Sequence, residues 1–166
     1  MSAVNSAVGV TAAGTVKISP LRSYPPAEKL PDFGAVKIAS ADLPAGLAVA
    51  PDGRILYSEF WRGRVRVIRA DGTVDPKPWA NVNAIYGFRW TRYYHGGLSG
   101  IAFDPEYATN RFVYVVTQIP SKRNGLPSTS LIVRFKEVGG RGTSPNVLYR
   151  IRAKVFDNVY SLVFGP

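Results

Sequence analysis

The chain has 166 residues, 46% of them hydrophobic and 19% charged, which is enough apolar material for a packed core and too little charge for a disordered chain. The absence of cysteine excludes disulfides and thiolate chemistry, and no apolar run approaches the roughly 20 residues that a membrane-spanning helix needs. Lys and Arg total 21 against 11 Asp and Glu, so the net charge of +10 favours anions without identifying a partner. The single histidine is His95, so any mechanism that needs an imidazole depends on it alone.

Residues 1–35 are predicted to be a flexible N-terminal leader. Residues 1–19 are mostly small and apolar, but the first basic residue is Lys17, so the positively charged start of a secretory signal is missing. Between residues 20 and 35, four prolines forbid a helix and favour an extended lead-in. We therefore expect no convincing signal peptide here.

From residue 43 the pattern is that of short antiparallel strands. The expected strands of the first half are 46–50, 54–60, 64–69 and 79–82, and the Asp-Gly pairs at 52–53 and 71–72 should close hairpins. Within 64–67 arginine and valine alternate strictly. We expect Val65 and Val67 to point into a core, and Arg64 and Arg66 to face solvent or a sheet edge. No stretch has a sustained helical period, so the fold class is all-β.

The pattern then repeats along the chain. The string Gly46-Leu-Ala-Val-Ala-Pro51 returns as Gly100-Ile-Ala-Phe-Asp-Pro105 and again as Ser161-Leu-Val-Phe-Gly-Pro166. A repeat of roughly 40–50 residues with four strands is typical of a β-propeller blade, and extra loop residues at 84–96 and 120–129 account for the longer intervals here. The second set of strands is expected at 98–103, 112–118, 130–138 and 146–152.

The expected domain is a partial propeller over 36–166, with blades near 43–83 and 96–153 and the start of a third at 160–166. A propeller needs at least about four blades to close. We therefore expect the chain to be the front part of something longer, unless it assembles with other copies; its oligomeric state stays open.

Four strings, in order, resemble one family. Leu43-Pro-Ala-Gly-Leu-Ala48 followed by Pro51-Asp-Gly-Arg54 resembles its opening W-G-L-A-F-L-P-D-G, and Arg62-Gly-Arg-Val-Arg-Val67 is similar to its G-R-L-R-V hairpin. The most specific string, 96–114, resembles G-G-L-L-x-x-A-x-x-P-x-F-x-x-N-R-x-V-Y, and 162–166 resembles R-L-x-F-G-P-D-G. On these residues, residues 43–166 resemble the soluble pyrroloquinoline-quinone (PQQ) dependent sugar dehydrogenases, the glucose/sorbosone dehydrogenase family.

The resemblance implies a six-bladed propeller that binds PQQ through calcium and has a sugar substrate, an electron acceptor and a periplasmic or extracellular location. It also implies a histidine base that takes the proton of the sugar C1 hydroxyl, as suits a pKa near working pH. Asp157 stands where the family has that histidine, and Val159 and Tyr160 replace two glycines after it. His95 replaces the usual Gln or Glu before Gly-Gly-Leu. The calcium ligands and most PQQ contacts of the family lie beyond residue 166.

Each candidate site residue has a structural alternative. His95 is either a cleft residue that contacts the sugar or a solvated loop histidine, and Asp157 is either a carboxylate base or a turn residue beside Asn158. The aromatic cluster that includes Trp90 and Tyr94 either stacks on sugar or packs a loop at the rim.

Two functions remain open on the sequence alone. One is the N-terminal part of a PQQ-dependent sugar dehydrogenase that oxidises an aldose C1 hydroxyl. The other is a non-catalytic propeller that binds carbohydrate or protein, because propellers host both. The arginines at 62–69 are expected to be a solvated strand face or to protect a sheet edge, and no nucleic-acid partner is expected. We expect membership of the enzyme family but little activity from this chain by itself.

Overall fold

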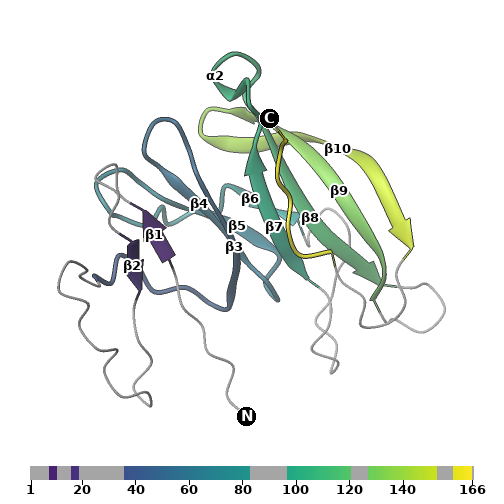
Figure 1. Cartoon of the computed structure of the whole chain (residues 1–166), viewed down its shortest axis with the longest axis horizontal. Helices are drawn as coiled ribbons and strands as arrows, with labels where there is room; N and C mark the ends of the chain where they lie inside the picture. The colour runs from purple at the N-terminus through teal and green to yellow at the C-terminus, as the bar shows by residue number, and fades with distance from the viewer. Residues whose placement is uncertain are drawn as a thin grey trace, which may run out of the picture.

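The structure, a computed structural model, describes residues 8–10, 16–18, 36–82, 97–120, 127–152 and 159–165. Within these segments the chain forms two four-stranded antiparallel sheets, a two-stranded pair and one short helix (Figure 1). In the first sheet the order is β3 (Pro44–Val49), β4 (Ile55–Glu59), β5 (Arg64–Ile68) and β6 (Ala80–Asn81). In the second sheet it is β10 (Arg141–Arg152), β9 (Pro127–Val138), β8 (Phe112–Pro120) and β7 (Leu98–Phe103).

The strands predicted from the sequence are confirmed, and all neighbours pair antiparallel. Gly53 has φ 82° and Gly72 has φ 85°, a left-handed conformation that glycine adopts without strain. The first closes the hairpin between β3 and β4, and the second brings Val74 back to a bridge with Ile68. Both predicted turns are therefore present.

Two features were not indicated by the sequence. Helix α2 (Tyr107–Asn110) is a single turn between β7 and β8. β1 (Val8–Val10) pairs with β2 (Val16–Ile18) inside the predicted leader. The flexibility of residues 1–35 stays a prediction. No helix in the described segments is long and apolar enough to cross a membrane.

The core lies between the two sheets. The parity predicted for β5 is confirmed, because Val65 is 0% and Val67 3% exposed in this core. Leu56 and Trp79 contribute from the first sheet and the segment after it, and the second sheet contributes Val113, Val115, Leu131, Val133 and Phe135. Arg64 and Arg66 lie on the opposite face and are half-buried rather than fully solvated.

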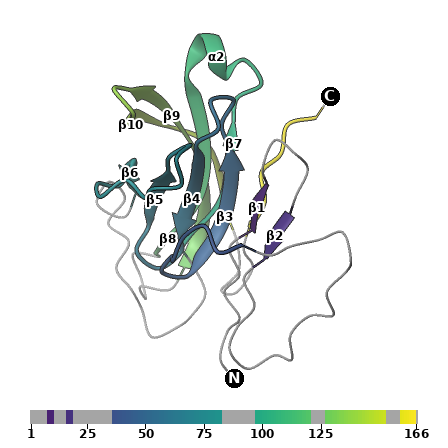
Figure 2. The ribbon, with the colours of Figure 1, turned by 90° about the vertical axis from the view of Figure 1, so that its left-hand side faces the viewer.

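The sequence repeat is also a repeat of contacts between neighbouring strands. A Cβ on Gly46 of β3 would collide with the carbonyl oxygen of Ser99 in β7, and β3 and β7 lie side by side (Figure 2). A Cβ on Gly100 of β7 would lie 2.9 Å from the carbonyl oxygen of Tyr160. Ser99 and Tyr160 hold the same position, just before the first residue of their repeat copies. Segment 159–165 therefore packs on β7 as β7 packs on β3.

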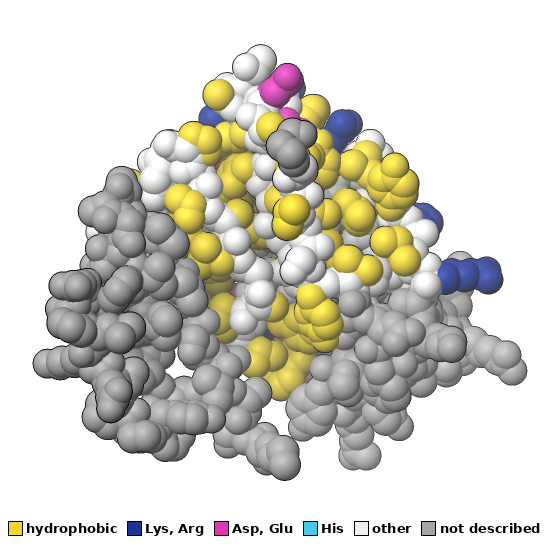
Figure 3. Space-filling model, viewed as in Figure 1, with side chains coloured by type: hydrophobic (Ala, Val, Ile, Leu, Met, Phe, Trp, Pro, Cys, Tyr) yellow, Lys and Arg dark blue, Asp and Glu magenta, His cyan; other side chains and the backbone are white. Residues whose placement is uncertain are grey.

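The face of the second sheet that carries segment 159–165 is rich in exposed apolar side chains (Figure 3). Tyr149 and Ile151 of β10 are 66% and 38% exposed, and Val163 is 82% exposed. In the first sheet, the equivalent face of the repeat is the one that packs against the second sheet.

Candidate functional site at the loop end of the sheets

The strand directions define two ends of the paired sheets. We call the end that carries α2 and the turns at 50–53 and 139–140 the turn end. The opposite end, where β3, β7 and β9 begin and β4, β8 and β10 finish, is the loop end. The predicted site residues His95, Asp157, Trp90 and Tyr94 lie outside the described residues. The described residues nearest to His95 and Asp157 in the sequence are Gly97 and Val159, and both lie at the loop end.

Phe60, the residue after β4, contacts the segments that lead into β3 and β7 at the loop end. Its N–H donates to the carbonyl of Leu43, and its own carbonyl accepts the N–H of Leu98 at 3.0 Å. A Cβ on Gly97 would collide with the Phe60 carbonyl and would lie 3.1 Å from Cδ1 of the Phe60 ring. Gly97, which carries part of the family resemblance, is therefore required by packing: only a glycine lets β7 start this close to Phe60.

Tyr160 covers Phe60 from the side of the next repeat. The two rings are nearly parallel, with centroids 6.4 Å apart and an interplanar angle of 13°. Phe60 is 7% exposed and Tyr160 is 52% exposed, so the pair has an inner and an outer ring. This pairing could not be predicted from the sequence, because the two residues are far apart in the chain; only the replacement of a family glycine by Tyr160 pointed to the position.

Hydrogen bonds fasten three segments together at this end. The hydroxyl of Ser58 accepts the N–H of Gly46 at 2.7 Å and donates to the carbonyl of Ser99 at 2.8 Å. The hydroxyl of Ser99 in turn donates to the carbonyl of Val159 at 2.8 Å. The backbone that leads out of His95 and the backbone that leads out of Asp157 are thus joined to each other and to the first sheet.

Two ion pairs of the loop end lie in and around the connection between β4 and β5. Arg62 donates to Asp42 at 2.7 Å, and this hydrogen bond raises the pKa of Arg62; its side chain is 63% exposed. Arg64 donates to the buried carboxylate of Glu59 at 2.8 Å. Among the described residues no group of three or more His, Asp or Glu is placed to hold a metal ion. The described part of the loop end thus combines a partly exposed aromatic pair with arginines that are ion-paired to carboxylates.

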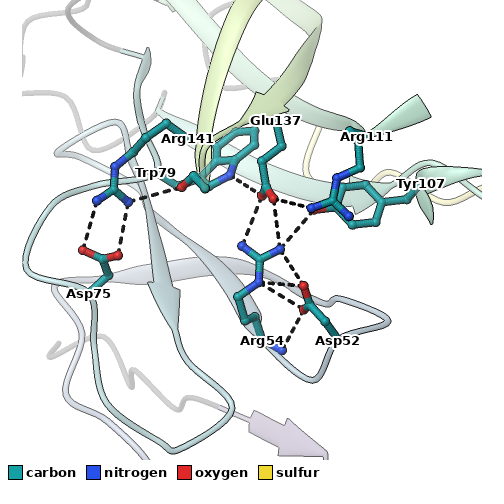
Figure 4. A network of polar contacts seen from close by, with 9 residues as sticks. Asp52, Arg54, Asp75, Trp79, Tyr107, Arg111, Glu137 and Arg141 are labelled. Atoms are coloured by element: carbon teal, nitrogen blue, oxygen red, sulfur yellow. Dashed lines mark hydrogen bonds and ion pairs between the residues drawn. The ribbon is translucent and has the colours of Figure 1, made fainter. Parts of the chain in front are cut away.

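The turn end has a different chemistry, centred on the buried carboxylate of Glu137 (Figure 4). Arg54 donates to both of its oxygens at 3.0 and 3.2 Å, Trp79 donates its indole N–H at 2.8 Å, and Arg111 donates at 3.0 Å. Burial by itself raises the pKa of Glu137, but the hydrogen bonds from Arg54 and Trp79 outweigh it and the net pKa is lowered. This network links the first sheet to the second, and the polar groups named here are paired. We call it the Glu137 clasp, and its role is to stabilise the contact between the sheets.

The later part of the most specific string of the family resemblance, from Asp104 onward, lies at the turn end. Asp104 accepts the N–H of Glu106, the side-chain amide of Asn110 at 2.8 Å and the hydroxyl of Tyr114 at 2.7 Å. Arg111 adopts a left-handed conformation with φ 60° and sends its guanidinium to Glu137. These residues shape the connection around α2, so this part of the string has a structural role.

A sequence profile of the Glucose / Sorbosone dehydrogenase family matches residues 41–160. The chain belongs to this family. Uncharacterized protein slr1608 of Synechocystis sp. is 39% identical over 88 residues, which are 51% of this chain and 21% of that protein.

Solved structures agree on the fold. A glucose dehydrogenase crystal structure matches with a TM-score of 0.56 and 23% identity, over 70% of this chain and 33% of that one. The PQQ-bound aldose sugar dehydrogenase of Streptomyces coelicolor matches with a TM-score of 0.50 and 26% identity, over 67% of this chain and 31% of that one. The two sheets are therefore blades of a sugar-dehydrogenase β-propeller, and the chain spans about a third of these structures and about a fifth of the Synechocystis relative.

Proposed function

We propose that the chain supplies the first part of a PQQ-dependent aldose dehydrogenase, with blades near 43–83 and 96–153 and a third that starts at 160–166. The observation that carries the proposal is the joining of the segments after His95 and Asp157 through Ser99 and Val159. If His95 and Asp157 contribute to one site, the backbone segments that follow them are hydrogen-bonded to each other. Family membership and the similarity to a PQQ-bound aldose sugar dehydrogenase support the substrate class and the cofactor.

In this proposal Asp157 takes the proton of the C1 hydroxyl and His95 hydrogen-bonds a sugar hydroxyl. Bound PQQ supplies the hydride acceptor. Proton removal from the oxygen makes hydride departure from C1 easier, so the base and its orientation set the rate. An aspartate with an ordinary pKa near 4 is a weaker base than an imidazole, and a general base typically contributes about 10²–10⁴ in rate. Trp90 and Tyr94 are proposed to contact the sugar ring.

A non-catalytic binding module is the second candidate. It is favoured by the replacement of the family's histidine by Asp157 and of two glycines by Val159 and Tyr160. A propeller with these changes keeps its sheets and loses the base, so it retains a binding face.

Titration of the purified chain with PQQ and calcium, followed by dye reduction with aldoses, separates the two functions. Because the family's calcium ligands and most of its PQQ contacts lie beyond residue 166, we expect weak PQQ binding and slow turnover, with faster turnover for Asp157→His. His95→Gln should weaken sugar binding without abolishing turnover. If turnover is lost on His95→Gln alone, the base is His95; if neither PQQ binding nor turnover occurs with Asp157→His, the dehydrogenase proposal is wrong and the binding module remains.

A further inference from the structure

We propose that the outer edge of β10, over residues 149–152, binds an extended acidic segment of a partner protein as an added β-strand. β10 is the last strand of the second sheet and lies at its outer edge (Figure 1). An edge strand presents backbone N–H and C=O groups with which another strand can pair. The proposal rests on this edge alone and does not depend on the proposed dehydrogenase function.

Only the final part of β10 has an edge suited to a new strand. At the start of β10 the N–H of Gly142 donates to the carbonyl of Trp79 at 2.8 Å, so the edge is occupied. The middle is irregular, because Ser144 has φ 49°, Pro145 has no N–H, and the register with β9 shifts twice. Such features protect an edge from pairing. Residues 149–152 pair regularly with β9, and no backbone hydrogen bond joins their other side to a described residue.

The side chains of this stretch alternate between apolar and cationic. Tyr149 and Ile151 share one face of the sheet and are 66% and 38% exposed, and Tyr149 pairs with Ile132 of β9. Arg150 and Arg152 are exposed on the other face. Neither arginine forms an ion pair with a carboxylate of the described residues. An incoming strand therefore meets two apolar side chains on one face and two uncompensated cations on the other.

This alternation defines the chemistry of the partner segment. The side chains of an added strand also alternate between the two faces, and directly opposite residues have Cβ atoms about 4.5–5.5 Å apart. Aspartate or glutamate is favoured opposite Arg150 and Arg152, and an apolar residue is favoured opposite Tyr149 and Ile151. The partner segment is therefore extended, with acidic and apolar residues in alternation. The net charge of +10 attracts such a segment at longer range.

Two other occupants fit this edge less well. A second copy that paired its own β10 antiparallel about a twofold axis would keep each face together, so arginine would lie opposite arginine. Like charges that are directly opposite destabilise a strand pair, so the two arginines disfavour self-pairing and select an acidic strand. A further blade would pack face to face, as the two sheets do here, and would leave the edge of β10 open.

The experiment is a fluorescence anisotropy titration of the full chain with a fluorescein-labelled octapeptide of alternating glutamate and valine. An octapeptide of alternating lysine and valine should not bind. The double variant Arg150→Gln/Arg152→Gln should bind the acidic peptide about two- to tenfold more weakly, the size expected for two exposed charge pairs. The double variant Lys37→Gln/Lys77→Gln is the matched control, because it removes two exposed cations outside the second sheet and should stay within about twofold of wild type. Amide hydrogen exchange of residues 149–152 should slow when the acidic peptide is added.

Four results would overturn the proposal. The acidic peptide could fail to bind wild type, or the lysine peptide could bind equally well. An equal loss of affinity in both double variants would show attraction to the net charge alone. Binding without slower exchange at residues 149–152 would show an ionic contact without an added strand. Slower exchange at the same residues on raising the protein concentration, with a dimer in sedimentation velocity, would make a second copy the occupant. The substitutions change exposed side chains, and circular dichroism establishes that each variant is folded.

Discussion

Replacement of Glu137 by glutamine should loosen the connection between the two blades. The carboxylate is 2% exposed, and each of its oxygens accepts two hydrogen bonds. One oxygen faces Arg54 and Arg111, and the other faces Arg54 and Trp79. An amide has only one oxygen, so in either orientation its NH₂ group faces two donors.

The expected cost follows from these partners. A buried donor without an acceptor costs about 1–3 kcal/mol, and Trp79, at 1% exposed, cannot turn to water. The lost charge interaction with Arg54 and Arg111 adds about 1 kcal/mol, because these side chains are 19% and 41% exposed and water screens them. Glu137→Gln should therefore lower the free energy of unfolding by about 2–4 kcal/mol.

Urea unfolding followed by tryptophan fluorescence and by far-UV circular dichroism measures this change. Glu106→Gln is the matched control: it makes the same chemical change at an exposed position near α2, and should stay within about 0.5 kcal/mol of wild type. If Glu137→Gln also stays within that range, the network does not hold the blades together and the argument from buried donors is wrong.

Two further predictions follow from the ends of the sheets. Gly97→Ala should destabilise the fold by about 1–3 kcal/mol, because its Cβ would collide with the Phe60 carbonyl, whereas Gly165→Ala, with nothing within 4 Å, should not; urea unfolding compares them. The hydrogen bond from Arg141 is the main cause that lowers the pKa of Asp75 to about 2, below its ordinary 3.8. Asp75 should therefore contribute stability above pH 4 that is lost as pH falls toward 2, and Asp75→Asn should flatten that part of the stability profile; an unchanged acid limb would contradict this.

The sequence was sufficient to predict the strands but not the contacts between them. Arginine and valine alternate at 64–67, and side chains two residues apart on a strand point to the same face of the sheet. The sequence therefore predicts that the valines of β5 are buried and the arginines are not. The bond between Arg54 and Glu137 joins different blades, so it depends on how the sheets pack. The same holds for Phe60 and Tyr160. The string 96–114 correctly indicated the family, although much of it shapes the turn end.

The predicted site residues stay predictions, for a related physical reason. His95, Asp157, Trp90 and Tyr94 were assigned from their place in a motif or a cluster, and such an assignment fixes the order along the chain but not the direction of a side chain. What the described residues add is the anchoring of the neighbouring backbone: Gly97 against Phe60, and Val159 on Ser99. The roles of the two candidate bases are decided by the variants proposed above.

The separation between the two ends explains how this chain can keep the family's fold while its site changes. The clasp around Glu137 and the turn built on Asp104 lie at the turn end, where every acceptor named above is paired across or within the blades. The departures from the family string, Val159 and Tyr160, lie at the loop end, where segment 159–165 meets β7 through backbone atoms of Gly100 and the hydroxyl of Ser99. Backbone contacts of this kind accept a change of side chain on the incoming segment. Substitution at the loop end can therefore alter the ligand, and with it the activity, without reaching the groups that hold the blades together.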